Sequence, residues 1–481
     1  MAAAGNIVTF DAVGYTKAEI FHYVQTMKTG LIQSLIDVFA QAFRGLQVDL
    51  PATELEDLAI TVHKAMSVEG RHYHTPEHVL LLADAANPIQ SLAALFHDLV
   101  YYQVDRGFSA EVWELIRPYL LTDAQQETES ILLEKTSPDD LCYRVALDIF
   151  GLSPGQKLFS APGFNEFISA LVMGKKLRHL LPPKVLLQAM VYIEATIPFR
   201  GNDAVGHGPF ELLEQRLRRA SQIYAIPLTE AEIEAAISGA VLFANKDVEN
   251  FSEKDPAQFL DNTWKLLPET NLSLRPGEIY SIRDYRLALE KTDAHFSQMI
   301  PEQVFHTYKG VPSEAEYREK VGYTRHNVET ARQYLGVKLL TIAILEALAE
   351  STGGDAPLSL FIGDASLNGE SAPCLADFLP QAAPHPGIDR TSAVYDLLQS
   401  ARSNPTELAD LTNSPLALFV YHRLGPVKAA EYLVHARALF AGALPAEQFL
   451  RLLDPALLAV IAQACAKMVP TRSVKLRRYV L

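Results

Sequence analysis

Three histidines and a glutamate fall within the ten residues RHYHTPEHVL, at positions 71–80, of a chain with only 14 histidines among 481 residues. Imidazole is the commonest metal-binding side chain in proteins. His78 follows His74 by four residues, and the dipeptide TP between them is typical of a helix start. We therefore expect His74 just before a helix and His78 in its first turn, where both could face one site.

A second candidate group lies in the apolar segment SLAALFHDLVYY, residues 91–102, which contains His97 and Asp98 side by side. Burial of an ionised aspartate in an apolar helix costs several kcal/mol unless a partner compensates its charge. A bound cation is the strongest such partner, and it would also explain the adjacent imidazole. The alternative is a capped or salt-bridged aspartate next to a packed histidine.

Two aspartates later in the chain could complete such a site. Asp247 ends the segment IEAAISGAVLFANKD, where apolar residues recur at steps of three and four and Asp247 shares their face. Asp148, in YRVALDIFGL, also has apolar neighbours. We expect Asp247 to be the site residue because its helix is longer and Lys246 adds a polar neighbour there, while Asp148 stays the alternative.

A further misplaced acid is Glu194 in the apolar segment LLQAMVYIEATIPFR. A buried glutamate has a raised pKa unless a cation or a donor meets it. Glu194 could orient a ligand histidine or shuttle a proton, or it could form a salt bridge with Arg200. The following loop, FRGNDAVGHGPF (199–210), could line a pocket in which Arg200 and His207 bind a phosphate. A plain polar connection is the alternative for this loop.

The motifs RHYHT and FHD together resemble the HD superfamily of metal-dependent phosphohydrolases, and they are similar to a branch with YHxxxH and FHDxVY motifs. The resemblance covers roughly residues 60–250 and includes the arginine three residues before the first ligand, Arg71 before His74. It implies an all-α HD-type helical bundle that binds one or two divalent ions. The ligands that it implies are His74, His97 and Asp98 with a distant aspartate, for which we choose Asp247.

Two imidazoles and two carboxylates suit Mn, Fe, Co, Zn or Mg. The expected reaction is hydrolysis of a phosphomonoester or phosphodiester, with a nucleotide as the favoured substrate class, by metal-activated water. His78 or Glu194 would protonate the leaving group, and Lys246 with Arg200 would offset charge on the phosphoryl oxygens. One alternative is a non-catalytic scaffold or sensor with an HD fold. Another is a di-iron oxygenase, with His78 and His207 as extra ligands.

Helical periodicity dominates the whole chain and predicts an all-α fold. Clear examples are residues 18–43, 184–197 and 327–350. We expect the HD-type domain within residues 1–270 and a helical extension of unknown role over residues 271–481.

The composition narrows the range of partners. Lysine and arginine total 42 against 57 acidic residues, a net charge of −15, which argues against binding to duplex DNA or anionic membranes but permits a small phosphorylated substrate. Three widely spaced cysteines indicate a reducing compartment. With no secretion signal and no apolar stretch long enough to cross a bilayer, we expect a cytoplasmic protein. Whether it forms a homo-oligomer stays open.

Overall fold

The computed structural model describes residues 30–122, 131–134, 139–158, 162–275, 279–363, 373–400 and 415–480. These residues confirm the all-α fold. The two strands in this part of the chain are β1 (Leu120–Thr122) and β2 (Ile131–Leu133), which pair as one antiparallel hairpin. Among the described residues, no helix combines the length and the apolar character that spanning a membrane requires.

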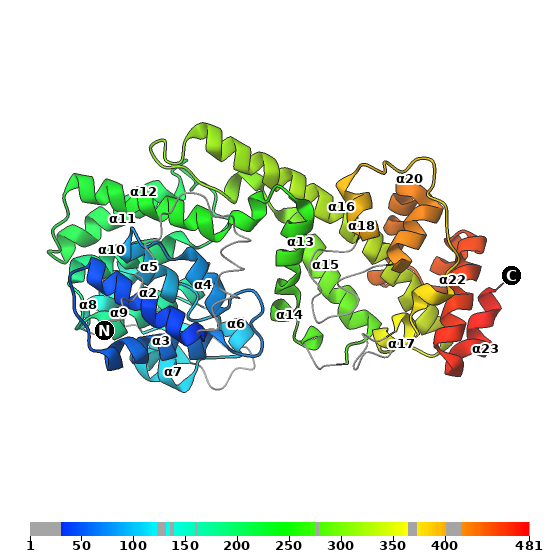
Figure 1. Cartoon of the computed structure of the whole chain (residues 1–481), viewed down its shortest axis with the longest axis horizontal. Coiled ribbons are helices and arrows are strands. Elements are labelled where there is room, and N and C mark those ends of the chain that lie inside the picture. Colours follow the sequence, from blue (N-terminus) through cyan, green and yellow to red (C-terminus); the bar gives the residue numbers. More distant parts are fainter. Residues whose placement is uncertain are drawn as a thin grey trace, which may run out of the picture.

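The described helices form two lobes, which lie at the left and the right of Figure 1. In the first lobe, α10 is buried on almost every side and packs against α5, α8, α9, α11 and α12, as expected of a helix that is apolar all round. The α-helices of this lobe are α2 (Leu31–Gly45), α3 (Ala52–Met66), α4 (Pro76–Leu82), α5 (Pro88–Phe96), α6 (Tyr102–Asp105), α7 (Ala110–Ile116), α8 (Leu141–Phe150), α9 (Phe164–Leu177), α10 (Pro183–Ala195), α11 (Pro209–Ile223) and α12 (Glu230–Asp247).

The second lobe has its own apolar core, which already includes Phe259 and so begins before the expected boundary at residue 270. Its α-helices are α13 (Pro256–Trp264), α14 (Leu266–Thr270), α15 (Ile282–Gln298), α16 (Glu314–Thr352), α17 (Leu358–Ile362), α18 (Ala393–Ser400), α20 (Pro415–Phe440), α21 (Ala446–Leu452), α22 (Pro455–Met468) and α23 (Ser473–Leu476). Short 3₁₀ helices complete the two lobes: η1 (Arg117–Tyr119), η2 (Glu249–Ser252), η3 (Leu272–Leu274), η4 (Pro301–Gln303), η5 (Leu375–Phe378), η6 (Pro470–Arg472) and η7 (Arg477–Tyr479).

The long helix α16 links the lobes, because it packs against η2, which follows α12, and runs into the second core (Figure 1). Near its start, Asn327 Nδ2 donates to the carbonyl oxygens of Phe251 (3.0 Å) and Glu253 (2.7 Å), which follow α12. The expected helix over 327–350 is the C-terminal part of α16. The helix expected from residue 18 is α2 from Leu31 onwards, and its first part lies outside the described residues.

The helices that carry the candidate residues begin where the sequence predicts, but one of the two expected N-cap side chains makes no capping hydrogen bond. Asn87 caps α5 by accepting a hydrogen bond from the backbone N–H of Gln90 at 3.1 Å. Thr75 is the N-cap residue of α4 and Pro76 is its first residue, but the Thr75 side chain makes no capping hydrogen bond. The fixed φ of proline therefore defines the start of α4 more than the threonine does.

The apolar pattern suggested that the His97–Asp98 doublet lies inside a helix. In the structure the doublet lies at the end of α5. Regular helix stops at Phe96, and His97 is the C-cap residue. Arg71 stabilises this helix end, because its guanidinium donates hydrogen bonds to the carbonyl oxygens of Asp98 (2.6 Å) and Leu99 (3.2 Å).

Candidate metal centre

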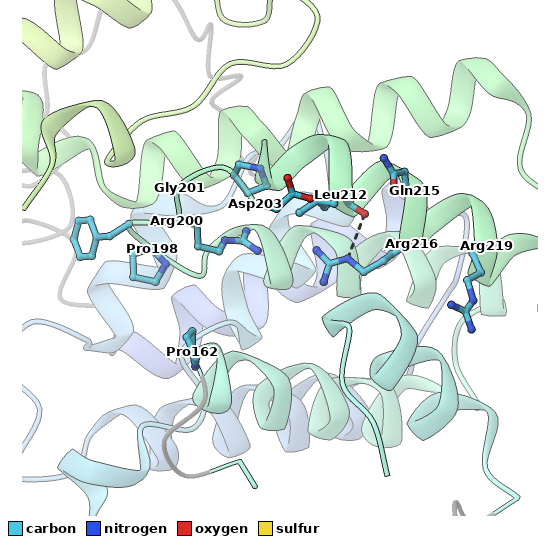
Figure 2. A pocket seen from close by; sticks show the side chains of 11 residues that line it. Pro162, Pro198, Arg200, Gly201, Asp203, Leu212, Gln215, Arg216 and Arg219 are labelled. Carbon is cyan, nitrogen blue, oxygen red and sulfur yellow. Dashed lines mark hydrogen bonds between the residues drawn. The ribbon is translucent and has the colours of Figure 1, made fainter. Parts of the chain in front are cut away.

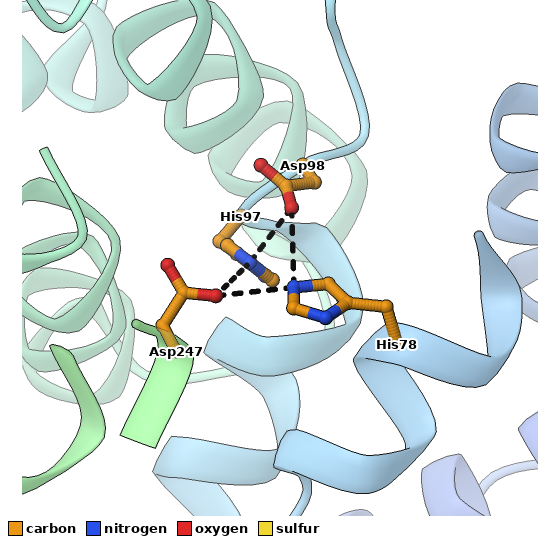
Figure 3. A group of neighbouring side chains, drawn as sticks. All are labelled: His78, His97, Asp98 and Asp247. Carbon is orange, nitrogen blue, oxygen red and sulfur yellow. Dashed lines mark hydrogen bonds and ion pairs between the residues drawn. The ribbon is translucent and has the colours of Figure 1, made fainter. Parts of the chain in front are cut away.

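Four side chains from three helices converge at one point in the first lobe, as Figure 3 shows. They are His78 from α4, His97 and Asp98 from the end of α5, and Asp247 from the last residue of α12, and one potential ligand atom of each lies within 4.8 Å of the others. His97 Nε2 lies 3.0 Å from Asp98 Oδ2 and 3.4 Å from Asp247 Oδ1. His78 Nε2 lies 3.1 Å from Asp247 Oδ1 and 3.5 Å from Asp98 Oδ2. We call these four residues the metal cluster.

The hydrogen bond of His97 to the backbone shows why this arrangement calls for a cation. His97 Nδ1 lies 2.8 Å from the carbonyl oxygen of Ala94, which can only accept, so Nδ1 carries a hydrogen. Nε2 is buried without a hydrogen-bond partner and faces two carboxylates. A lone pair that faces two negative groups needs a proton or a metal ion between them. Burial alone would lower the pKa of His97, but the charges of Asp98 and Asp247 raise it well above its usual value.

The distances within the metal cluster fit the binding of one divalent ion. Ligand atoms that bind an ion at about 2.1 Å are about 3.0 Å apart along an octahedral edge and about 3.4 Å apart along a tetrahedral edge. The four nitrogen–oxygen distances, from 3.0 to 3.5 Å, are close to these two values. Burial opposes ionisation of Asp98, yet the neighbouring imidazoles of His97 and His74 hold its pKa well below the usual range, so its carboxylate is ionised. The cluster could therefore hold a metal through two nitrogens and two oxygens.

Arg71 holds the doublet in place from the side away from the metal cluster. Its side chain is fully buried and forms a two-point ion pair with Asp105. Nε donates to Oδ1 at 2.8 Å, and Nη2 donates to Oδ2 at 2.6 Å. The same guanidinium binds the carbonyl oxygens of Asp98 and Leu99. Since Arg71 has its donors fixed by these four acceptors, it restrains the backbone that carries Asp98.

His74, the ligand implied by the HD resemblance, is not a member of the metal cluster, and His78 occupies that position instead. His74 Nδ1 lies 2.7 Å from Glu269 Oε2, and its ring centroid lies 6.0 Å from that of His78. Its ring also makes an edge contact with Tyr101 at 4.8 Å between centroids. The structure thus places His74 beside the metal cluster and leaves its Nε2 for a further contact.

Asp148, the alternative to Asp247, lies elsewhere in the first lobe. The hydroxyl of Tyr224 donates to its Oδ2 at 2.7 Å. Lys246 points to the backbone near the end of α4, where its Nζ lies 3.4 Å from the carbonyl oxygen of Leu82. Of the two aspartates, the structure brings Asp247 to the doublet. The role of Lys246 in charge compensation stays a prediction.

Glu194 forms salt bridges with two arginines, one of which is Arg200, the partner named in the alternative interpretation of this residue. The carboxylate is only 1% exposed, and its Oε1 accepts from Arg200 at 2.6 Å and from Arg216 at 2.7 Å. Arg200 uses four of its five N–H groups on Glu194 and on the carbonyl of Ile197, which leaves little of the expected fork for a phosphate. Both arginines line a cavity of about 730 Å³, shown in Figure 2, to which no member of the metal cluster contributes.

His207 lies on the loop between α10 and α11, close to Asp203. Its Nδ1 lies 3.2 Å from Asp203 Oδ2, and its side chain is 45% exposed. Asp203 also accepts the backbone N–H of His207 at 2.8 Å, a local turn within the loop. His207 is not part of the metal cluster, so the extra ligand required by the di-iron alternative is not brought there.

Glu166 is a residue near the metal cluster that the sequence analysis did not select. It lies in the first turn of α9 and is partly buried. Burial, together with the charges of Asp98 and Asp247, raises its pKa to about 7 against the opposing effects of a backbone hydrogen bond and of His97. Acidic residues are common in the first turn of a helix, because their negative charge interacts favourably with the positive end of the helix dipole. The sequence therefore offers no signal that separates Glu166 from an ordinary helix residue.

Comparisons of the chain with known protein families, with curated proteins and with solved structures found no match. The case for a metal centre therefore depends on the geometry of the metal cluster and on the buried Nε2 of His97 that faces two carboxylates.

Proposed function

We propose that the protein is a metal-dependent phosphohydrolase of the HD type that cleaves a phosphomonoester or phosphodiester, with a nucleotide as the favoured substrate class. The observation that carries the proposal is the convergence of His78, His97, Asp98 and Asp247, which supplies two nitrogen and two oxygen ligands at mutual distances suited to one ion. A divalent ion held by these residues would activate water at neutral pH and polarise a phosphoryl oxygen. This cluster includes three of the four ligands implied by the HD resemblance.

The residues around the cluster suggest how protons are handled. The expected proton donors were His78 and Glu194. His78 contacts the two carboxylates of the cluster, and Glu194 forms salt bridges with two arginines. Glu166 is better suited, because its pKa of about 7 keeps a proton available near neutral pH. Within this proposal Glu166 gives its proton to the leaving alkoxide, and Arg71 keeps Asp98 in position.

The part of the substrate that does not react would occupy a cavity of about 880 Å³ between the lobes. Its size suits a nucleotide-sized molecule. Two of its lining residues, Tyr101 and Glu269, contact His74, which connects the cavity with the edge of the metal cluster. Among the described residues that line it, Lys291 is the one with a positive charge for a phosphate, and the acidic Glu269 and Asp284 also line the cavity. The other lining residues are Gln103, Val104, Asn165, Thr270, Asn271, Leu272, Ser273 and Leu287.

The test has two steps. Protein purified without chelators is analysed for bound metal, and phosphoesters including nucleotides are then screened with Mn²⁺, Co²⁺, Mg²⁺ or Zn²⁺. We expect Asp247→Asn to lose both the metal and the turnover, whereas the matched variant Asp148→Asn retains both, because Asp148 binds Tyr224 instead. Equal metal content in the wild type and in His97→Ala would show that the ligand assignment is wrong.

A non-catalytic scaffold or sensor is the second candidate function. The observation that favours it is the separate core of the second lobe, which extends to Leu476 and contains no member of the metal cluster. This candidate predicts that metal raises the unfolding temperature while no phosphoester turns over under any of the four ions.

A further inference from the structure

Glu269 connects the two lobes at the edge of the metal cluster. It belongs to α14 of the second lobe, and its side chain is completely buried. Its carboxylate reaches the turn before α4 in the first lobe. One oxygen, Oε1, accepts the backbone N–H groups of His72 (2.7 Å), Tyr73 (2.7 Å) and His74 (3.0 Å), and the other, Oε2, lies 2.7 Å from His74 Nδ1.

Three consecutive N–H groups that point at one oxygen form a concave site for an anion. The turn of residues 72–74 is therefore shaped around the carboxylate of Glu269. The second lobe also contacts α6 near this turn through Arg275, whose Nη2 donates to the carbonyl of Val104 at 2.8 Å. The same Nη2 atom lies against Gly70, where an added Cβ would come within 2.4 Å of it, so a larger residue at position 70 would displace the guanidinium of Arg275.

The bond between Glu269 and the ring of His74 has a chemical consequence. A carboxylate only accepts hydrogen bonds, so His74 Nδ1 must carry a hydrogen. The neutral ring then has its lone pair on Nε2. Histidines that bind metals commonly have this tautomer, with the other ring nitrogen donating its hydrogen to a carboxylate. The ring of His74 lies next to that of His78, with 6.0 Å between centroids, and the charge of Asp98 acts on it.

We propose that Glu269 of the second lobe is a positioning residue of the metal centre, which fixes the turn of residues 72–74 and presents Nε2 of His74 to the bound metal. The inference depends on the proposed metal centre and adds to it the role of the second lobe. The lobe that the sequence describes only as an extension is thus part of the site, since the turn that carries His74 is bound to it by four hydrogen bonds.

The experiment measures the affinity of the full chain for Mn²⁺, from the EPR signal of the free ion, in Glu269→Gln. The glutamine keeps the size of the side chain, and its oxygen can still accept backbone N–H groups. Its NH2 group would face Nδ1 of His74, which favours the tautomer with the hydrogen on Nε2. We expect the affinity to fall about 10- to 100-fold, as for other groups that orient a ligand histidine. The control is Arg275→Met, which weakens the contact between the lobes without touching His74 and should bind Mn²⁺ as the wild type does.

Two further variants separate the possible failures. If Asp98→Asn binds Mn²⁺ with wild-type affinity, the metal centre itself is wrong. If Asp98→Asn loses the ion and Glu269→Gln keeps full affinity, the metal centre stands and the role of Glu269 is refuted. Should Glu269→Gln not fold, His74→Ala decides the question, because this variant must also bind Mn²⁺ at least 10-fold more weakly if Nε2 of His74 faces the metal. Wild-type affinity in His74→Ala would overturn the inference.

Discussion

Replacement of Glu166 by glutamine tests whether burial and the carboxylates of the metal cluster raise the pKa of this residue. The pKa of this carboxyl is about 7 in the folded chain, against 4.5 for an ordinary glutamate. At about 1.4 kcal/mol for each pKa unit, ionisation of Glu166 destabilises the folded protein by about 3 kcal/mol. This is an upper value, because the side chain is only partly buried and solvent screens its charge.

The direction of the pH dependence follows from the raised pKa. A group that holds its proton more tightly in the folded state stabilises that state below pH 4.5, and this stabilisation is lost as the pH rises to about 7. Glutamine carries no proton to lose. The free energy of unfolding of Glu166→Gln should therefore exceed that of the wild type at high pH, and the difference should grow by about 2.5 kcal/mol between pH 5 and pH 8.

The assay is urea unfolding, followed by circular dichroism, of the metal-free protein in EDTA at both pH values. Other titrating groups affect both proteins equally and cancel in the difference. Addition of Mn²⁺ in place of EDTA should reduce the gain at pH 8, since the bound cation offsets the charges of Asp98 and Asp247. Glu56→Gln is the control, because Glu56 is exposed on α3 and its replacement should change stability by less than about 0.5 kcal/mol. Equal stability of Glu166→Gln and the wild type at both pH values would refute the reasoning.

Three further substitutions test the surroundings of the site. Arg71→Met should lower the free energy of unfolding by about 3–5 kcal/mol, measured with urea, because it leaves the carboxylate of Asp105 without its buried partner. Asp148→Asn should leave the metal content unchanged in elemental analysis; loss of the metal would show that Asp148 is a ligand in place of Asp247. Glu194→Gln should lower the free energy of unfolding by roughly 2–4 kcal/mol, since it breaks ion pairs with two arginines. The same variant should keep its metal, and a destabilised protein that also loses the ion would contradict the placement of Glu194 outside the centre.

Local patterns in the sequence were sufficient for the all-α fold and for much of the candidate site. The three-and-four spacing of apolar residues predicted α10 and α12, because a helix buries one face at that period. The same spacing indicated that Asp247 points to the core, and the apolar neighbours of His97 and Asp98 indicated burial. These are properties of single helices, which depend on residues close together in the chain.

The remaining features depend on which helices pack together. From the sequence we chose His74 as the ligand, whereas the structure brings His78 to the cluster. Both histidines lie near the start of α4, and only the packing of α4 against α12 directs His78 to Asp247. The sequence showed one arginine near Glu194 but not the second, which comes from the neighbouring α11.

The sequence alone determined that the chain is helical and acidic and that it places imidazoles and carboxylates at buried positions. Local periodicity and composition dictate these properties. Only the tertiary structure decided which of those groups meet. Glu269 binds His74 across 195 positions of sequence. Such a contact leaves no local pattern, because it exists only where the two lobes pack against each other.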